Sequence, residues 1–410
     1  MTGRVHAREE AGRPDYGRRR ENESTPSRRG RPPLASTRSR AIAAAGLVVL
    51  ASVVGVLAGV GALSRAPSAP SDHSAGATNL AAAQASIQRG QAPASVVRAT
   101  GGGTAPSSRW ALMMTWDAAD GYVLAFGGIA SNGNKLAQTW SFVGGTWTQL
   151  SPTTHPSARE GGMMTYDAAD GYVLLFGGYH SGSKALDDTW TFVGGQWTKL
   201  SPSVHPPVTE WAGIAYDPVH QYVVMFGGDK IIDTPKYDTT WIYHAGVWMR
   251  PTLELPKSPI ARNYAAMAYD PANQLVILFG GLGTGGGYLG DTWGFNATGP
   301  TSGEWFNLTA ASQGVDPSFR AFMSMTYDPS VGGLILYGGE STSGFDSDTW
   351  EYVDDAWSEL TPLTSPGALD YYGLAYDPTD GYLVLFGGQH PGDQISAQTW
   401  TFSGGTWTKL

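Results

Sequence analysis

One pattern recurs six times between Arg109 and the last residue of the chain. In each copy a short hydrophobic stretch ends in Tyr-Asp or Trp-Asp, and a Gly-Gly pair begins ten residues after this Asp. Two further stretches follow, and each contains a Trp. The Asp residues of the six copies are Asp117, Asp167, Asp217, Asp270, Asp328 and Asp377. Such a sixfold repeat predicts tandem copies of one structural unit and not a set of unrelated domains.

Each copy has the pattern of a four-stranded antiparallel meander. In the second copy, GMMTYD and YVLLFGG form two expected strands, joined by a turn that Asp167 is placed to cap with its side chain. TWTFV and QWTKL form two more, joined by a Gly-Gly hairpin turn. A unit of about 50 residues with four strands is typical of a propeller blade. We therefore expect residues 105–410 to form an all-β domain without exchange of strands between its first and last blades.

The Gly-Gly pair after the second strand, with one Trp in each of the next two strands, resembles the kelch repeat. The Trp pairs are Trp140/Trp147, Trp190/Trp197, Trp241/Trp248, Trp293/Trp305, Trp350/Trp357 and Trp400/Trp407. This resemblance implies a six-bladed kelch-type β-propeller. It implies much less about function, because kelch propellers include metal oxidases, sugar epimerases and, most often, protein-binding modules.

The N-terminal quarter of the chain predicts a membrane anchor. Residues 41–63 form a run of 23 residues without a charge, which is long enough to cross a bilayer as one helix. Residues 1–40 contain eleven Arg, so we expect a disordered cytoplasmic tail, with the propeller outside the cell. The length of the run favours an uncleaved signal-anchor, and cleavage with release is the alternative. Residues 64–104 have the Ala, Ser, Pro and Gly content of a flexible linker.

Composition excludes some classes of function. The net charge of −9 combines a basic tail with a propeller that has 12 basic and 29 acidic side chains, so nucleic acid is not an expected partner. Cysteine is absent, which excludes disulfides, thiolate metal sites and the Cys-linked tyrosyl radical of the copper oxidases that the kelch pattern resembles. The Arg, Ala and Gly content is typical of a bacterium with a GC-rich genome.

The candidate binding residues lie where the copies differ. Eight residues before the repeated Asp, four of the six copies have Arg, and the next two positions are rich in acidic and aromatic residues. The distance between one copy and the next also varies on this face, and variable loops on a rigid scaffold usually carry function. These positions lead into the innermost strands, so we expect them to surround the mouth of the central channel. The candidate residues are Arg109, Trp110, Arg159, Glu160, Glu210, Trp211, Arg262, Tyr264, Arg320, Phe322, Asp370 and Tyr371.

An Arg-lined mouth with an aromatic rim predicts binding of a protein, an acidic peptide or a glycan outside the cell. The alternative is structural, with each Arg joining neighbouring blades and Trp110 and Trp211 filling gaps between them. The second function we consider is a carbohydrate-active enzyme, a sugar epimerase or glycosidase, using Glu160, Glu210 or Asp370. The His residues lack metal-ligand spacing, and the Ser-x-Asp-x-Gly-x-x-Trp box of sialidases occurs in no copy. We therefore predict no catalytic residue, metal or cofactor.

Overall fold

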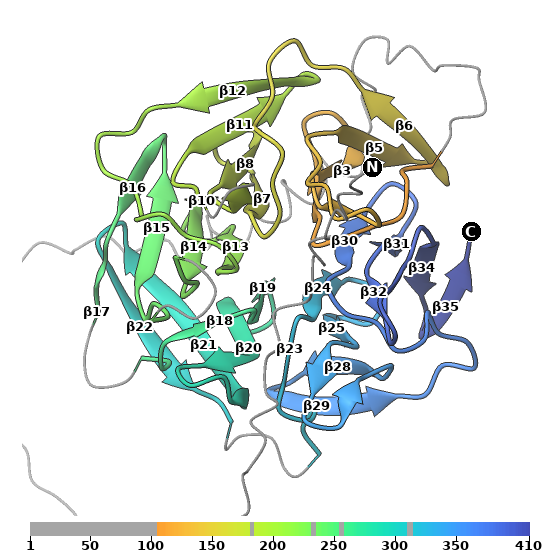
Figure 1. Cartoon of the computed structure of the whole chain (residues 1–410). Coiled ribbons are helices and arrows are strands. Elements are labelled where there is room, and N and C mark those ends of the chain that lie inside the picture. Colours follow the sequence, from red (N-terminus) through yellow and green to blue (C-terminus); the bar gives the residue numbers. More distant parts are fainter. Residues whose placement is uncertain (1–104, 181–183, 231–234, 254–257, 310–314) are drawn as a thin grey trace, which may run out of the picture. The chain divides into compact units, whose positions relative to one another are not determined.

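The computed structural model describes residues 105–180, 184–230, 235–253, 258–309 and 315–410, which belong to one compact unit (Figure 1). These residues form strands and no helix, and within them no helical segment has the length and apolarity needed to span a membrane. The all-β prediction is therefore confirmed for this part of the chain. The predicted tail, the predicted membrane helix at residues 41–63 and the predicted linker lie outside the described residues.

Six sheets of four or more strands form the body of this unit, and the four principal strands of each come from one copy of the repeat and pair antiparallel (Figure 1). In every sheet the four principal strands pair in chain order. The strands are, from the first sheet to the sixth, β2 (Met113–Asp117), β3 (Tyr122–Phe126), β5 (Thr139–Val143) and β6 (Thr146–Leu150); β7 (Met163–Asp167), β8 (Tyr172–Phe176), β11 (Thr189–Val193) and β12 (Gln196–Leu200); β13 (Gly213–Asp217), β14 (Tyr222–Phe226), β15 (Thr240–His244) and β16 (Val247–Met249); β19 (Ala266–Asp270), β20 (Leu275–Gly283), β21 (Tyr288–Gly299) and β22 (Ser302–Asn307); β24 (Ser324–Asp328), β25 (Gly333–Tyr337), β28 (Thr349–Val353) and β29 (Ala356–Leu360); β30 (Gly373–Asp377), β31 (Tyr382–Phe386), β34 (Thr399–Ser403) and β35 (Thr406–Lys409).

Short strands lie at one end of the sheets. Three pairs join the segment that enters a sheet to the segment after its Gly-Gly pair, namely β1 (Arg109–Trp110) with β4 (Ile129–Ala130), β18 (Arg262–Asn263) with β20, and β23 (Arg320–Ala321) with β26 (Glu340–Ser341). Three further pairs follow a Gly-Gly pair, namely β9 (Tyr179–His180) with β10 (Lys184–Ala185), β26 with β27 (Gly344–Phe345), and β32 (Gln389–His390) with β33 (Gln394–Ile395). In addition, β17 (Thr252–Leu253) pairs in parallel with β22 in the fourth sheet.

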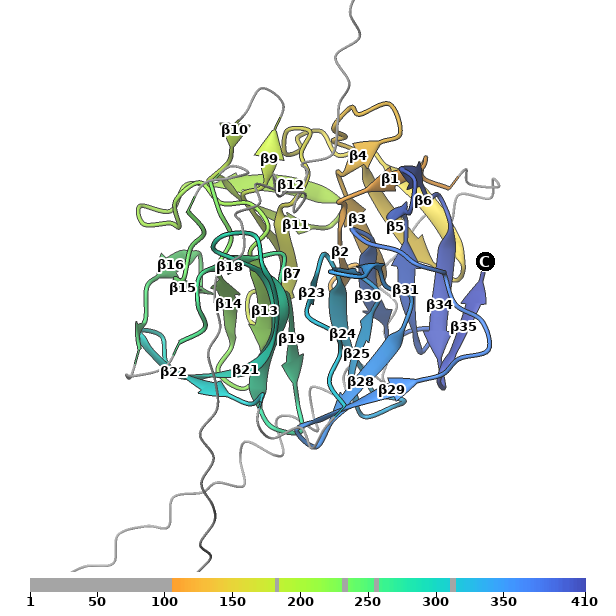
Figure 2. The ribbon, with the colours of Figure 1, turned by 60° about the horizontal axis from the view of Figure 1, so that its bottom comes forward.

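The first strands of the six sheets contact one another in a closed cycle, running from β2 through β7, β13, β19, β24 and β30 back to β2. The remaining strands of each sheet lie progressively further from this centre (Figures 1 and 2). Apolar side chains pack between adjacent sheets. Phe126 and Trp197, for example, join the first sheet to the second with their ring centres 5.2 Å apart. The arrangement is that of a propeller-like all-β fold.

The Gly-Gly pair is required because two backbones meet at it. Gly177 has a φ of +62°, and a Cβ atom placed on it would lie 2.4 Å from the carbonyl oxygen of Thr209 in the next sheet. A Cβ atom on Gly178 would lie 2.7 Å from the carbonyl oxygen of Glu160. Only glycine fits such positions. The pair therefore marks the point where the chain entering one sheet crosses the sheet before it.

The second Trp of each copy joins neighbouring sheets through its indole N–H. Each Nε1 donates a hydrogen bond of 2.9 to 3.2 Å to the hydroxyl of the Thr that precedes the first Trp in the third strand of the preceding sheet. The pairs are Trp147–Thr399, Trp197–Thr139, Trp248–Thr189, Trp305–Thr240, Trp357–Thr292 and Trp407–Thr349. Because Trp147 reaches Thr399, the cycle closes between the first and sixth sheets.

The repeated Asp caps the first turn of its sheet, as the sequence predicts. Oδ1 of Asp117 accepts hydrogen bonds from the backbone N–H groups of Ala119 and Asp120, at 3.1 and 3.3 Å. The carboxyl group is fully buried. Burial, reinforced by the charge of Asp120, raises the pKa of Asp117 to about 7.

Candidate binding site at the mouth of the central channel

A ring of six backbone hydrogen bonds surrounds one end of the central channel. The residues that form it, which we call the mouth ring, occupy the same position in the six sheets and all have a φ between +53° and +65°. Each donates its backbone N–H to the carbonyl oxygen of the preceding member, at distances from 2.7 to 3.4 Å, and Ala111 closes the cycle by donating to Tyr371. The mouth ring consists of Ala111, Gly161, Trp211, Tyr264, Phe322 and Tyr371.

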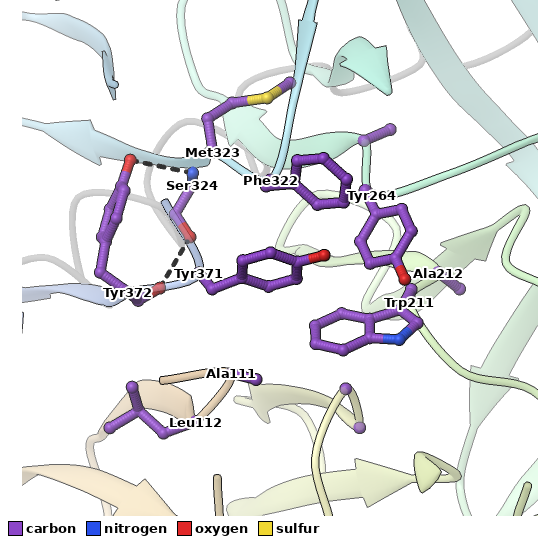
Figure 3. Close-up of a pocket in the computed structure, with 13 residues that line it drawn as sticks. Ala111, Leu112, Trp211, Ala212, Tyr264, Phe322, Met323, Ser324, Tyr371 and Tyr372 are labelled. Atoms are coloured by element: carbon purple, nitrogen blue, oxygen red, sulfur yellow. Dashed lines mark hydrogen bonds between the residues drawn. The ribbon is translucent and has the colours of Figure 1, made fainter. Parts of the chain in front are cut away.

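Four aromatic side chains of the mouth ring pack against one another over the channel (Figure 3). The ring centre of Tyr264 lies 4.8 Å from Trp211 and 4.3 Å from Phe322, and Tyr371 lies 4.6 Å from Phe322. Trp110 packs edge-on against Tyr371 at 5.0 Å. Of these side chains, Trp110, Trp211 and Tyr371 are half-buried, whereas Tyr264 and Phe322 are buried. We call these five residues the aromatic cluster.

The aromatic cluster depends on the small residues in the first two sheets. A Cβ atom on Gly161 would lie 2.5 Å from Cε2 of Trp211, so the indole lies directly over this glycine. Ala111 lies on the far side of the pocket from the aromatic rings (Figure 3). The four aromatic rings therefore occupy the space at the mouth, and large side chains at all six positions of the mouth ring would not fit there.

A cavity of about 160 Å³ lies against the aromatic cluster and is lined by residues of all six sheets. A second cavity of about 150 Å³ shares part of this lining. Both are smaller than the roughly 300 to 1,000 Å³ of pockets that enclose a drug-sized ligand. A ligand of that size therefore has to lie across the mouth and not inside the channel.

The four candidate arginines, Arg109, Arg159, Arg262 and Arg320, have buried side chains. The prediction that they line the mouth is therefore wrong. Their exposed fractions are 0 to 1%. Each donates from Nη1 to the carbonyl oxygen of the first Gly of its own Gly-Gly pair. Each also bonds a side chain 28 or 29 residues further along the chain. The pairs are Arg109–Gln138, Arg159–Asp188, Arg262–Asp291 and Arg320–Asp348.

The geometry of the second sheet explains why these arginines are buried. Nη1 and Nη2 of Arg159 bond the two carboxylate oxygens of Asp188 at 2.6 and 2.9 Å, and Asp188 also accepts the indole N–H of Trp190. Burial alone would raise the pKa of Asp188, but the hydrogen bonds and charge of Arg159 outweigh it and hold this pKa below its ordinary value. The arginine thus fixes the Gly-Gly corner to the start of the third strand within one sheet.

The carboxylates of the rim have different surroundings. Glu160 accepts a 2.5 Å hydrogen bond from Lys135 Nζ, which also lies 4.7 Å from the centre of the Tyr179 ring. Burial raises the pKa of Glu160, and Lys135 opposes this effect. Asp370, in the sixth sheet, is fully buried and pairs through its backbone with Gln389.

Glu210, in the third sheet, is the remaining carboxylate of this set. It is 1% exposed. Burial raises its pKa to about 9, and the charges of Asp229 and Glu160 raise it further than Lys135 lowers it. Glu210 is therefore protonated at neutral pH. A carboxyl group in that state donates a hydrogen bond as well as accepting one.

Two residues of this part of the rim escaped the sequence prediction. Asn263 Nδ2 donates a 2.8 Å hydrogen bond to Asp229 Oδ2, and both side chains are 1% exposed. A signal for Asn263 was present, because it occupies the position of Glu160 and Glu210 in its own copy. Asp229 directly follows a Gly-Gly pair, and its backbone pairs with Glu210. In the part of the chain that the structure describes, no group of three or more His, Cys, Asp or Glu has an arrangement suited to a metal ion.

Comparison with known proteins identifies the fold and leaves the family open. No model of a protein family matches the chain, and no curated protein matches its sequence. Matches to 291 solved chains show that the fold is widespread, so the fold alone does not indicate a function. One of these structures, titled "Structure of YjhT", is similar over 75% of this chain and 98% of that one, with 15% identity and a TM-score of 0.56. The described residues are thus an all-β domain of propeller-like architecture.

Proposed function

We propose that this chain is a membrane-anchored, six-bladed kelch-type β-propeller that binds a protein or glycan outside the cytoplasm. The observation that carries the proposal is the aromatic cluster, because Trp110, Trp211 and Tyr371 remain half-buried at the mouth. The scaffold does not require aromatic residues there, since Ala111 and Gly161 complete the same mouth ring in two sheets. Half-exposed Trp and Tyr are the side chains that most often anchor a ligand or stack on a sugar.

The internal arginines change the expected ligand. An acidic peptide was predicted from an Arg-lined mouth, but these guanidinium groups are bonded within their own sheets. The aromatic cluster and the neighbouring carboxylates remain at the rim. These favour a ligand with apolar or sugar-ring faces, so a glycan or a protein surface fits the mouth better than an acidic peptide.

An enzymatic function is the second candidate, and the state of Glu210 favours it. A carboxyl group whose pKa is raised to about 9 holds a proton at neutral pH and can act as a general acid. Asp229 and, in the adjacent sheet, Glu160 are carboxylates whose charges contribute to that shift. Turnover of a glycan separates the two functions, because a carbohydrate-active enzyme would show it and lose it in Glu210→Gln, whereas a binding module would show none.

The membrane anchor rests on the uncharged run at residues 41–63 and the eleven Arg before it. In intact cells, protease added outside should digest the propeller and leave the N-terminal tail protected. Recovery of a soluble form that starts near residue 66 would instead show cleavage and release.

The binding proposal is tested by screening the full-length protein on glycan and peptide arrays. Trp211→Ala should weaken capture of any ligand found by at least about tenfold, because a central aromatic anchor typically contributes 2 kcal/mol or more. Phe306→Ala is the matched control, since Phe306 is an aromatic residue exposed on the outer strand β22. Equal capture by both variants and the unchanged protein would remove the mouth as the binding site.

A further inference from the structure

The second and third sheets place a glutamate at the same position of the rim, but only one of the two has a cation. Glu160 is paired with Lys135, which comes from the preceding sheet. The position equivalent to Lys135 in the next sheet is Ala185. Both residues lie four positions before the third strand, and the residues that follow them, Leu136 and Leu186, donate their backbone N–H to the second Gly of the preceding Gly-Gly pair at 2.8 Å. Glu210 therefore lacks the lysine that its repeat equivalent has.

Two buried hydrogen-bond acceptors at Glu210 and the nearby Asn263 receive no hydrogen bond from the described residues. Within the described residues, Oε1 of Glu210 has no hydrogen-bond partner, although the side chain is only 1% exposed. Oδ1 of Asn263 also has no partner there, while the amide nitrogen of Asn263 is used by Asp229. Lys230 follows Asp229 in sequence, but its side chain is exposed. A buried acceptor without a donor destabilises the protein, so a ligand that brings a donor gains binding energy.

We propose that the rim at Glu210 is a receptor site for the ammonium group of a lysine side chain on a protein ligand. The inference rests on the proposed binding function of the mouth and specifies its ligand. Lys135 is the template, because the protein holds this lysine with the carboxylate of Glu160 and the ring of Tyr179. An ammonium group at the third sheet would donate to Glu210 Oε1, and Asn263 Oδ1 offers a neighbouring acceptor. Since Glu210 is 1% exposed, binding of the ligand requires the side chains around it to move.

Binding in this way releases a proton. The carboxyl group of Glu210 gives up its proton to solvent, and the resulting carboxylate pairs with the ammonium group, so charge and atoms balance. The pKa of Glu210 is raised to about 9 by burial and by the charges of Asp229 and Glu160. Affinity should therefore rise about tenfold for each pH unit between about 6 and 9, because the ammonium group itself keeps its proton up to about pH 10.

The test compares an end-capped Gly-Lys-Gly peptide with its twin that carries Nε-acetyl-lysine, by calorimetric titration of the full-length protein at pH 8. The lysine peptide should bind at least about tenfold more tightly than its neutral twin. Glu210→Gln should remove this preference. Ala185→Lys should also remove it, because the new lysine would occupy the site as Lys135 does at Glu160. Glu359→Gln, on the exposed face of β29, should keep the preference.

Equal affinity for the two peptides, or a preference that survives Glu210→Gln, would overturn the inference. Binding of glucosamine without binding of the lysine peptide would also overturn it, since the amine would then come from a sugar. If a ligand from the arrays depends on Trp211 but not on Glu210, the lysine site is wrong while the binding function stands. Should Glu210→Gln fail to fold, Ala185→Lys alone decides, because Ala185 is half-buried at the edge of β10.

Discussion

Arg159 and Glu160 are neighbours in the chain, but their charges are compensated differently. The partner of Arg159 belongs to the same sheet, whereas the partner of Glu160 belongs to the preceding sheet. The arginine bonds Gly177 and Asp188 of its own sheet. The glutamate takes its cation, Lys135, from the preceding sheet. In the third sheet, Oε1 of the glutamate at the same position, Glu210, has no hydrogen-bond partner among the described residues. Residues that repeat with their partners belong to the scaffold, and residues whose partner is missing mark the candidate site.

The sheets without arginine support this distinction. Thr209 and Leu369 occupy the arginine position in the third and sixth sheets, and the partner positions there hold Thr239 and Gln398 in place of Asp. In these two sheets both charges of the buried pair are absent, which costs less than the loss of one member alone. The first sheet differs, because it keeps Arg109 with the neutral Gln138 as its partner.

The largest effect that tests the comparison is the loss of one arginine partner. Asp188→Ala should lower the free energy of unfolding by about 3 to 5 kcal/mol, because Arg159 would keep a buried charge without its carboxylate. Denaturant unfolding measures this change. Asp187→Ala removes an adjacent but exposed carboxylate and should change stability by less than about 0.5 kcal/mol. Similar losses in the two variants would show that the Arg159 pair is not a structural unit.

A smaller effect tests whether the mouth ring sets the space for the aromatic cluster. Gly161→Ala should destabilise by about 2 to 3 kcal/mol, because the new methyl group meets Trp211 at a backbone position that already disfavours alanine. Gly171→Ala is the matched control, with a φ of +74° and no atom within 4 Å of the added Cβ. It should cost only about 1 kcal/mol. If the two variants lose the same stability, the contact with Trp211 contributes nothing.

The smallest effect concerns pH. The pKa of Glu210 is about 9 in the folded protein and near its ordinary value of 4.5 in the unfolded protein. The folded state therefore keeps this proton up to a higher pH than the unfolded state does. Stability should therefore fall as pH rises through this window, by up to about 1.4 kcal/mol per pH unit. Glu210→Gln should remove this slope. Denaturant unfolding between pH 7.5 and 9 is the informative range, because the raised pKa values of Asp117 and Asp167, about 7 and 6, lie below it. Parallel pH profiles for the two proteins would contradict the assignment.

The scaffold was predictable because its residues recur in every copy and because each has a structural role that can be recognised from the sequence. Asp167 predicted a capped turn, and the hydrogen bond that it accepts from the backbone of Ala169 confirms it. The role of the arginines was also encoded in the sequence. An Asp precedes the Thr-Trp of the third strand in three of the four copies that have Arg, and it is missing where Arg is missing. Comparison of the copies at this second position would have identified the pairs.

The site itself could not be predicted in the same way. The contact between Lys135 and Glu160 joins two sheets through a connection whose length varies from copy to copy, so no fixed spacing reveals it. The proximity of Asp229, Asn263 and Glu210 depends on how the third and fourth sheets lie beside each other. Such contacts are set by the arrangement of the blades in space. The pattern within a single repeat therefore does not predict these contacts between sheets.

The mouth ring is closed by main-chain atoms alone, and it therefore tolerates Ala, Gly, Trp, Tyr and Phe at equivalent positions. A mutation there alters what the mouth presents without breaking a link of the closure. Selection could thus have exchanged one ligand for another in single steps wherever the new side chain fits the space between its neighbours. For the same reason, a library that varies only these six side chains would be a practical starting point for giving this scaffold a new specificity.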